Sequence, residues 1–357
     1  MIVRNLSLRN FRNYQNIKVN FSTTLNVIVG KNGSGKTNLV ESIHYLSLAK
    51  SFRLVDDEEL IAHNQDFAEI NAELSEGETK RTVTVIISKQ GKTILVNGKK
   101  IEKLSSLSKL INVIIFEPSD VLLFKDSPSK RRRFLDVAIS KQNSLYLERL
   151  IIYEKLLKER NDILKGENID PQHLEIVTEQ LIRAAEPIVR ERAHYVQRVN
   201  EVLNKIVPHI TNETKTLELK YQPFVQYDEN FLTNAKEALK RAEEGDIKRK
   251  ATSIGPHRED LSMNLNGRDI ATFGSQGENR IASLALILSP YFLIDDGDKK
   301  PIVILDDVMS ELDEIHQQKL LVFVKKLRQV FITTTNIKVN DACIYKVSGN
   351  TIERRKS

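Results

Sequence analysis

The chain has 357 residues, of which 40% are apolar, so about two domains with sizeable cores are expected and a wholly disordered chain is excluded. Its 54 Lys and Arg against 48 Asp and Glu give a net charge of +6, which permits an anionic partner such as nucleic acid without demonstrating one. The single cysteine, Cys343, excludes an intramolecular disulfide and favours a reducing cytosol.

Strand-like segments occupy most of residues 2–30: IVRNLSLRNF, NIKVNF and TLNVIVG. The first of them lacks the apolar run of a signal peptide. Further along, the Asn97-Gly98 pair is a strong hairpin signal. We therefore predict mixed strand and short helix over most of residues 35–125.

The segment GKNGSGKT matches the phosphate-binding loop pattern G-x-x-x-x-G-K-[ST], and it lies between a strand-like run and a helical run, as that motif requires. Its glycines allow backbone N–H groups to surround phosphates, Lys36 is expected to reach the β- and γ-phosphates, and the Thr37 hydroxyl is expected to ligate Mg²⁺. The alternative is a chance Gly-rich turn, which the flanking strand and helix argue against. The predicted ATP-binding residues are Gly30, Lys31, Asn32, Gly33, Ser34, Gly35, Lys36, Thr37 and Asn38.

A mainly helical stretch begins at Ser127 and Pro128, which fit a helix N-cap and first turn. Its amphipathic pattern continues past a second start signal at Asp170 and Pro171, with one strand candidate at TLELKY. Strand-like character returns near Ile254, so an α/β nucleotide-binding head is predicted to be assembled from both ends of the chain. The expected parts are 1–126 and 251–357 for the head and 127–250 for an inserted helical lobe.

The densest basic run, KRRR, lies in the first turn of the predicted helix at Lys130, Arg131, Arg132 and Arg133. Positive charge at a helix N-terminus opposes the macrodipole, which slightly favours a partner such as a DNA phosphate. A solvated helix face is an equal alternative, and Arg132 could instead belong structurally to the head. A second basic cluster at 248–250 has the same ambiguity.

The stretch FGSQGENR at 273–280 has the small residues of a turn that exposes backbone N–H groups, and the helical run IASLALIL follows it. An ordinary helix N-cap at Ser275 is the alternative interpretation. The apolar run at 284–294 is too short to span a bilayer and contains Ser289 and Pro290. We expect a buried helix there, in a cytoplasmic protein without a membrane partner.

The segment PIVILDD at 301–307 is predicted to be a buried parallel strand whose acids emerge at its C-terminal edge. Asp306 is expected to hold Mg²⁺ directly or through water, and Asp307 is expected to orient or deprotonate the attacking water. Surface strands often end in acids, so this pattern is weak alone. Combined with the phosphate-binding loop it becomes strong.

The order of these motifs is phosphate loop, Ser-x-Gly turn with its helix, acid-ended strand and then SELD, and this order resembles the ABC-type ATPases. In that superfamily the signature turn caps the γ-phosphate of ATP held by the opposite subunit of a head-to-tail dimer. The resemblance implies an ABC-type head fold and an ATP-dependent homodimer. It assigns ATP contact in trans to Ser275, Gln276, Gly277 and Glu278, and dimer contact to Ser310 and Asp313.

Six blocks run nearly end to end in the order found in the RecF family of bacterial recombination mediators: NFRNY, GKNGSGKTNLVESIHYLSLAKSFR, FEPSDVLLFKDSPSKRRRFLD, GPHRED, FGSQGENR and ILDDVMSELD. The chain is similar to that family, and it lacks the long heptad runs of chromosome-maintenance ATPases. The resemblance implies weak, DNA-stimulated ATP hydrolysis and binding to duplex DNA and to single-/double-strand junctions. It also implies cooperation with RecR and RecO in loading RecA at gaps.

Three positions depart from the wider ABC pattern. Glu278 stands where Gln is common, Asp307 where a catalytic Glu is usual, and Thr335 at the switch position where many ABC proteins have a histidine. The shorter carboxylate and the missing imidazole predict slow hydrolysis, with ATP acting as a timed dimer clamp. Because a carboxylate that faces a phosphate costs energy, Glu278 is expected to point away or to pair with a basic residue.

The main alternative function is an ATPase subunit that drives a membrane or protein partner and has no DNA role. The wide spacing of the motifs and the GPHRED block argue against it, and a small-molecule kinase would need no signature turn. In that block, His257 and Arg258 follow a Gly-Pro turn and are expected to have a structural or subunit-contact role. The seven histidines show no metal-ligand spacing.

Overall fold

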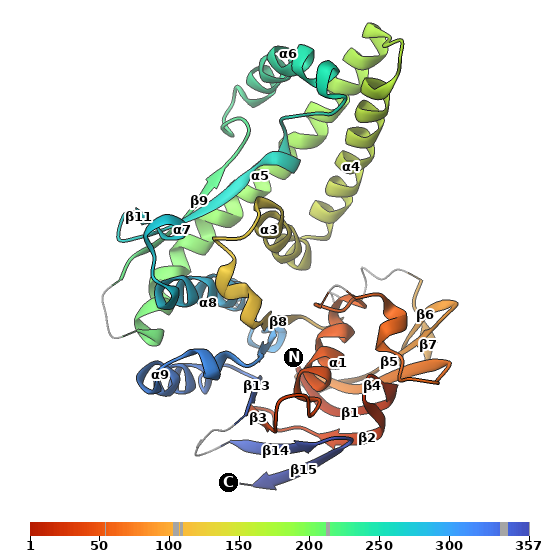
Figure 1. Ribbon diagram of the computed structural model, residues 1–357, viewed down its shortest axis with the longest axis vertical. Helices are drawn as coiled ribbons and strands as arrows, with labels where there is room; N and C mark the ends of the chain where they lie inside the picture. The colour runs from red at the N-terminus through yellow and green to blue at the C-terminus, as the bar shows by residue number, and fades with distance from the viewer. Residues whose placement is uncertain (54, 103–106, 108–109, 212–214, 336–341, 357) are drawn as a thin grey trace. The chain divides into compact units, whose positions relative to one another are not determined.

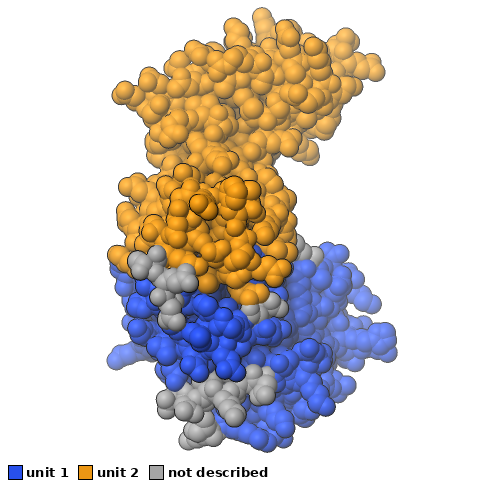
Figure 2. Space-filling model, turned by 60° about the vertical axis from the view of Figure 1, so that its left-hand side comes forward, with its two compact units in different colours: residues 1–121, 208–214, 284–357 blue, residues 122–207, 215–283 orange. Residues whose placement is uncertain are grey.

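The computed structural model divides into two compact units (Figure 2). It describes the whole chain except residues 54, 103–106, 108–109, 212–214, 336–341 and 357. Unit 1 comprises residues 1–121, 208–214 and 284–357, and unit 2 comprises residues 122–207 and 215–283. Both ends of the chain therefore lie in unit 1.

The first sheet of unit 1 has six antiparallel strands in the order β2-β1-β4-β5-β6-β7 (Figure 1). Alternate residues of β1, such as Leu6 and Leu8, are buried, as expected for strands with one solvated face. Asn97 and Gly98 both have positive φ, 50° and 78°, so the predicted hairpin turn between β6 and β7 is confirmed. The strands are β1 (Ile2–Phe11), β2 (Tyr14–Asn20), β4 (Phe67–Glu76), β5 (Thr79–Ser88), β6 (Gly91–Val96) and β7 (Lys99–Lys100).

The second sheet of unit 1 has the order β15-β14-β3-β13-β12-β8, and its strands are parallel except for β15. A strand from the start of the chain, β3, therefore lies between two strands from its end. Because β3, β12 and β13 are parallel, their C-terminal ends lie at one edge, where α/β proteins bind ligands. The strands are β3 (Leu25–Val29), β8 (Val113–Phe116), β12 (Ile302–Leu305), β13 (Val330–Thr334), β14 (Cys343–Ser348) and β15 (Thr351–Lys356).

Helix α1 (Lys36–Leu48) packs into one apolar core that also contains residues of both sheets. Among its described residues, unit 1 also contains α9 (Glu314–Val324), the C-terminal part of α8 (Gln276–Phe292) and four 3₁₀ turns. Leu284, Leu286 and Leu288 of α8 are fully buried, so the predicted buried helix is confirmed. Across the described part of the chain, no helix has the length and apolar character needed to cross a bilayer. The 3₁₀ turns are η1 (Asp57–Leu60), η2 (Pro118–Leu122), η4 (Gly297–Lys299) and η5 (Val308–Glu311), of which η2 ends at the unit boundary.

Unit 2 is mainly helical and includes a three-stranded sheet in the order β11-β10-β9. The strand candidate TLELKY corresponds to β9. Since β9 pairs with β10, residues 260–265 fall within unit 2, which therefore extends past the lobe boundary expected at 250. Its elements are α3 (Pro128–Gln142), α4 (Ser144–Lys165), most of α5 (Pro171–Ile210), β9 (Leu217–Gln222), α6 (Phe231–Arg249), η3 (Pro256–Arg258), β10 (Asp260–Leu265), β11 (Arg268–Asp269), α7 (Ile270–Phe273) and the start of α8.

Candidate nucleotide site and signature turn

The phosphate-binding loop connects β3 to α1, in the strand–loop–helix context that the motif requires. Gly33 and Gly35 have φ of 76° and 104°, a conformation that residues with a Cβ rarely adopt. A Cβ on Gly35 would also lie 2.6 Å from Asn13 Nδ2. The Tyr14 hydroxyl donates to the Gly35 carbonyl at 2.9 Å, so the first residue of β2 holds the end of the loop.

The Lys36 ammonium lies within the curve of the loop. Its Nζ donates to the carbonyl oxygens of Gly30 at 2.8 Å and Lys31 at 3.0 Å. Burial lowers the pKa of Lys36, and the negative charges of Asp307 and Asp306 oppose that shift. The loop therefore encloses a positive charge next to two acids.

Asp306 follows directly after β12 and connects three elements of unit 1. Its Oδ1 accepts hydrogen bonds from Thr37 Oγ1 at 3.1 Å and from Thr333 Oγ1 at 2.5 Å. Burial raises the pKa of Asp306, and the bonds from Thr333 and Thr37 oppose that rise. The structure thus brings together the loop threonine and the strand-end acid that sequence reasoning paired.

Asp307, the next residue, has a left-handed backbone with φ of 49°. Its backbone N–H donates to Thr333 Oγ1 at 2.9 Å, and its carbonyl accepts from Ser310 Oγ at 2.8 Å. Its side-chain Oδ1 is buried and has no hydrogen-bond partner among the described residues. A strained backbone and an unpaired buried carboxylate oxygen are both typical of functional sites.

The other two residues predicted near this edge are exposed. Thr335 follows the end of β13 at the surface, as the first residue after the strand. Asp313 caps α9, where its carboxylate accepts from the backbone N–H of His316 at 2.9 Å and lies 2.7 Å from His316 Nδ1. Thr333, which sequence reasoning missed, connects the two acids instead.

Glu41 of α1, the helix that follows the loop, is a fully buried carboxylate with several basic and polar partners. Arg12 donates two hydrogen bonds to it, each of 3.0 Å, and Ser51 donates a third of 2.6 Å. Arg53 lies 3.7 Å from Glu41 and donates to Asn38 Oδ1 at 3.0 Å. Sequence reasoning did not identify this cluster, and the one available signal was that Arg12 and Arg53 lie in the NFRNY and SFR blocks.

The signature turn begins α8 and belongs to unit 2. The backbone N–H and the hydroxyl of Ser275 both donate to Glu278 Oε2 at 3.0 Å, and the Glu278 N–H donates back to Ser275 Oγ at 3.2 Å. This reciprocal pair is a capping box. Glu278 Oε1 also accepts from Lys215 Nζ at 3.2 Å, so the expectation that Glu278 pairs with a basic residue is confirmed. Gln276 and Gly277 are exposed.

The basic run at the start of α3 separates into two kinds of residue. Arg131 is buried and binds the Asp260 carboxylate through two hydrogen bonds of 2.7 and 2.8 Å, so it is not free to contact DNA. Arg132 donates to the Glu259 carbonyl at 2.7 Å. A structural role was expected for Arg132 in the head. The structure instead gives such a role to both Arg131 and Arg132, and both lie in unit 2. Lys130 and Arg133 are exposed, and Lys130 pairs with Asp126.

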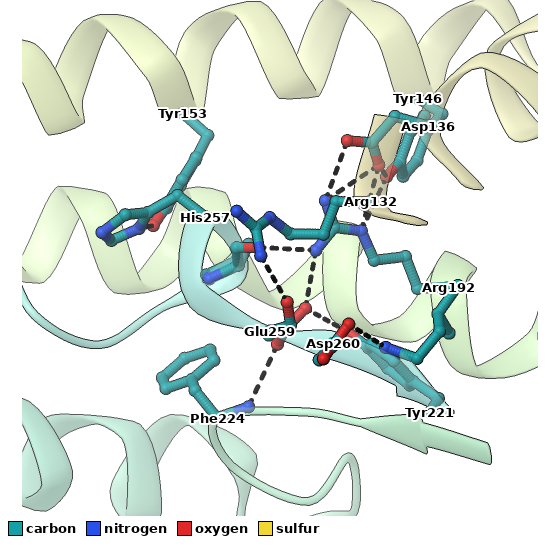
Figure 3. A network of polar contacts seen from close by, with 12 residues as sticks. Arg132, Asp136, Tyr146, Tyr153, Arg192, Tyr221, Phe224, His257, Glu259 and Asp260 are labelled. Atoms are coloured by element: carbon teal, nitrogen blue, oxygen red, sulfur yellow. Dashed lines mark hydrogen bonds and ion pairs between the residues drawn. The ribbon is translucent and has the colours of Figure 1, made fainter. Parts of the chain in front are cut away.

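The GPHRED block contributes His257, Glu259 and Asp260 to a polar network in unit 2 (Figure 3). At its centre, Arg192 contacts Asp136 at 2.8 Å and Glu259 at 2.7 Å, so its charge is paired. His257 Nδ1 lies 2.7 Å from the Tyr153 hydroxyl, and its Nε2 lies 3.0 Å from the Thr252 carbonyl. These contacts give His257 the structural role that was expected. Arg258 is exposed.

No group of three or more His, Cys, Asp or Glu side chains within the described ranges could hold a metal ion without other ligands. Mg²⁺, however, usually binds through one or two carboxylates together with substrate phosphates. Thr37 and Asp306, whose side-chain oxygens lie 3.1 Å apart, are donors of that kind. The arrangement therefore suits a metal ion that arrives with a nucleotide.

Comparison with known proteins gives consistent results over the full chain. The profile of the RecF/RecN/SMC N terminal domain matches residues 2–355. The DNA replication and repair protein RecF of Bacillus pumilus is 37% identical over 99% of this chain and 100% of its own length, and that of Halalkalibacterium halodurans is 36% identical over 99% and 100%.

Solved structures agree with these sequence relatives. The structure of the recombination mediator RecF with ATP, from the RecFOR pathway, has a TM-score of 0.89 and 31% identity, covering 99% of this chain and 97% of that one. An Smc head domain from Pyrococcus furiosus has a TM-score of 0.58 at 14% identity, covering 99% and 95%, and supports the head fold alone.

Proposed function

This chain belongs to the RecF family of DNA replication and repair proteins, within the ABC/SMC-like ATPases, and on that premise we propose that it is an ATP-switched DNA-binding protein of recombinational repair. The observation that carries the proposal is the contact of Thr37 with Asp306, at 3.1 Å and 269 residues apart in sequence. It joins a phosphate-binding loop to a strand-end acid, the pair of groups that nucleotide hydrolysis needs.

In this proposal ATP binds along residues 30–38, where backbone N–H groups and Lys36 contact its phosphates. Thr37 and Asp306 would hold Mg²⁺, and the donor set around them suits that ion. When bound, the metal supplies charge neutralisation at the phosphate oxygens. Asp307 orients the attacking water and accepts its proton, with its unpaired Oδ1 as the acceptor atom.

The site is completed by a second copy of the chain in a head-to-tail dimer. The signature turn, Ser275 to Glu278, contacts the γ-phosphate held by the partner chain, and Ser310 and Asp313 contact the partner near the same nucleotide. Hydrolysis is slow, because Asp307 is shorter than the usual Glu and Thr335 has no imidazole. ATP therefore holds the dimer closed, and its hydrolysis releases the dimer.

The anionic partner is DNA, as duplex and as single-/double-strand junctions. Of the four residues in the basic run, the exposed Lys130 and Arg133 are the ones proposed to contact DNA phosphates. The net charge of +6 also favours a DNA partner. The solved RecF is a recombination mediator of the RecFOR pathway, and on that similarity we include RecR, RecO and RecA loading in the proposal.

The test is binding of a labelled duplex with a single-stranded tail, with and without ATP, at two salt concentrations. We expect ATP to strengthen binding, and higher salt to weaken it. Lys36→Met should remove the ATP effect while leaving the fold intact. Binding that neither ATP nor salt changes would contradict a DNA role and favour an ATPase subunit with a protein or membrane partner.

A further inference from the structure

The Ser275 hydroxyl has only one proton to donate, and it donates that proton in a hydrogen bond to the Glu278 carboxylate. A carboxylate is an acceptor only, so the 3.0 Å contact between Ser275 Oγ and Glu278 Oε2 requires the serine to be the donor. Hydrogen bonds from the Ser275 backbone and from Lys215 lower the pKa of Glu278, so it stays ionised at neutral pH. Phosphate oxygens are also acceptors. In this arrangement the serine has no proton left for a γ-phosphate.

Glu278 keeps other partners when the hydroxyl turns away. Its Oε2 also accepts the Ser275 backbone N–H at 3.0 Å, and its Oε1 accepts from Lys215 Nζ at 3.2 Å. Rotation about the Ser275 Cβ–Oγ bond is therefore enough to redirect the proton, with the carboxylate still in place. The Lys215 and Glu278 side chains are 16% and 30% exposed, so solvent screens their attraction less than that of a surface pair.

The two acceptors compete for one proton and also repel each other. A phosphate that approached Ser275 would meet a fixed negative charge at Glu278, and like charges at short range oppose binding. Lys215 reduces that charge from the opposite side of the carboxylate. Its contact with Glu278 links β9, which begins two residues after Lys215, to the first turn of α8.

We infer that Glu278 restrains the signature turn and that Lys215 offsets the restraint, so that this pair sets how tightly two chains close over ATP. The inference rests on the proposed head-to-tail dimer and adds its regulation. Glu278 lowers the affinity of Ser275 for the partner's γ-phosphate by holding its proton and by its charge. Lys215 is a positioning residue, because it acts on the nucleotide through its contact with Glu278.

The test is the ATP-dependent dimer dissociation constant, measured by sedimentation velocity with a non-hydrolysable ATP analogue. Glu278→Gln removes the charge and adds an N–H donor, so the dimer should tighten about tenfold, the size of one charge-assisted hydrogen bond. Lys215→Met keeps the side-chain stem but leaves the carboxylate unneutralised, so the dimer should weaken about tenfold. Lys215→Arg keeps the positive charge, so its dimer dissociation constant should stay close to that of the unmodified chain.

The double variant separates positioning from simple damage. When Glu278 is already Gln, the charge that Lys215 offsets at this position is gone, so Lys215→Met should change the dimer dissociation constant much less than in the unmodified chain. A merely structural lysine would weaken both backgrounds equally. Lys220→Met is the matched control, since Lys220 on β9 pairs with Glu218 at 3.5 Å and belongs to a separate surface pair.

The outcomes are distinct. If the unmodified chain dimerises with the analogue and Glu278→Gln does not lower the dissociation constant of the dimer, the inference is overturned. The proposed dimer then still stands. Additive effects of the two substitutions would overturn the role of Lys215. If no chain dimerises with the analogue, the unmodified one included, the proposed function fails and this inference fails with it.

Discussion

The Thr333 hydroxyl, on β13, accepts a hydrogen bond of 2.9 Å from the backbone N–H of Asp307, which follows β12. The same hydroxyl donates to Asp306. One side chain on a neighbouring strand therefore holds both the Asp306 carboxylate and the left-handed backbone of Asp307.

Replacing Thr333 with Val keeps the shape of the side chain and removes the hydroxyl. The Asp307 N–H then lacks its partner, and we expect a loss of about 1–2 kcal/mol in the free energy of unfolding. ATP hydrolysis, measured as phosphate release, should fall about tenfold because the acids lose their orientation. Thr333→Ser keeps the hydroxyl and is the control. Equal rates for Val and Ser would show that this bond does not position the acids.

Asp307→Asn tests the proposed proton acceptor. Asn tolerates a left-handed backbone, so the fold should be kept, but an amide cannot take a proton from water. We expect phosphate release to fall at least about tenfold and ATP-dependent dimers to live longer, as size-exclusion chromatography would show. Unchanged phosphate release would remove Asp307 from the mechanism. Turnover in the unmodified chain on the order of hundreds per second, typical of fast enzymes, would contradict the slow clamp.

Ser275→Arg places a bulky side chain at the signature turn. Ser275 belongs to unit 2, whereas the phosphate-binding loop belongs to unit 1. Isolated chains should therefore still bind a fluorescent ATP analogue, while ATP-dependent dimers should disappear in sedimentation velocity. Normal dimers of this variant would show that the turn does not contact the partner's nucleotide.

His257 is expected to make the stability of unit 2 depend on pH. Burial lowers the pKa of His257 below its usual 6.5, the bond to the Thr252 carbonyl opposes this, and the charges of Arg258 and Arg132 lower it further. As the pH decreases below about 6.5, the unfolded chain therefore binds more protons than the folded chain does. The free energy of unfolding should decrease as the pH decreases, by at most about 1.4 kcal/mol per pH unit.

Denaturant titrations between pH 7.5 and 5.5, on the order of one unit either side of the usual histidine pKa, would measure this slope. His257→Gln should flatten it within that window. His173, whose side chain is 53% exposed, provides the matched substitution, His173→Gln, at a histidine outside the buried network. An equal slope in the unmodified chain and in His257→Gln would assign the pH dependence to other groups.

Two neighbouring arginines should respond differently to the same substitution. Arg133→Gln removes an exposed charge, so DNA affinity should fall a few-fold and the slope of log affinity against log salt should decrease by about one. Arg131→Gln leaves Asp260 without its paired bonds, so the free energy of unfolding should fall by about 2 kcal/mol. A salt slope that Arg133→Gln leaves unchanged would exclude Arg133 from the DNA contact.

Features that depend on adjacent residues could be predicted from the sequence. The phosphate-binding loop has its strand, its helix and its left-handed glycines because the motif itself encodes that geometry. The adjacent Asn266 and Gly267 likewise have the left-handed backbone that an Asn-Gly hairpin turn favours, with φ of 50° and 81°. Glu278 pairs with a cation, which is one of the two arrangements expected for a carboxylate at that position.

Partners that lie far apart in the chain could not be predicted. Lys215 and Glu278 are 63 residues apart, and nothing in one sequence selects that lysine among the others. Arg131 illustrates the resulting error, because its run has the pattern of a DNA contact while Asp260, 129 residues away, binds it. Thr333 was missed for the same reason, since its role depends on which strands are neighbours.

Because β3 lies between β13 and β14, the ribosome makes the phosphate-binding loop long before it makes the strands that flank it in the sheet. Thr37 leaves the ribosome 269 residues before Asp306, a delay on the order of 10–50 s at about 5–20 residues per second. During that interval the nascent loop has neither neighbouring strand nor acid. A chain cut short by a premature stop before β12 would lack the proposed ATP site. Where the stop lies after α8, such a fragment would still contain the signature turn, Ser275 to Glu278, but it would lack the acids and the strands that complete its own site.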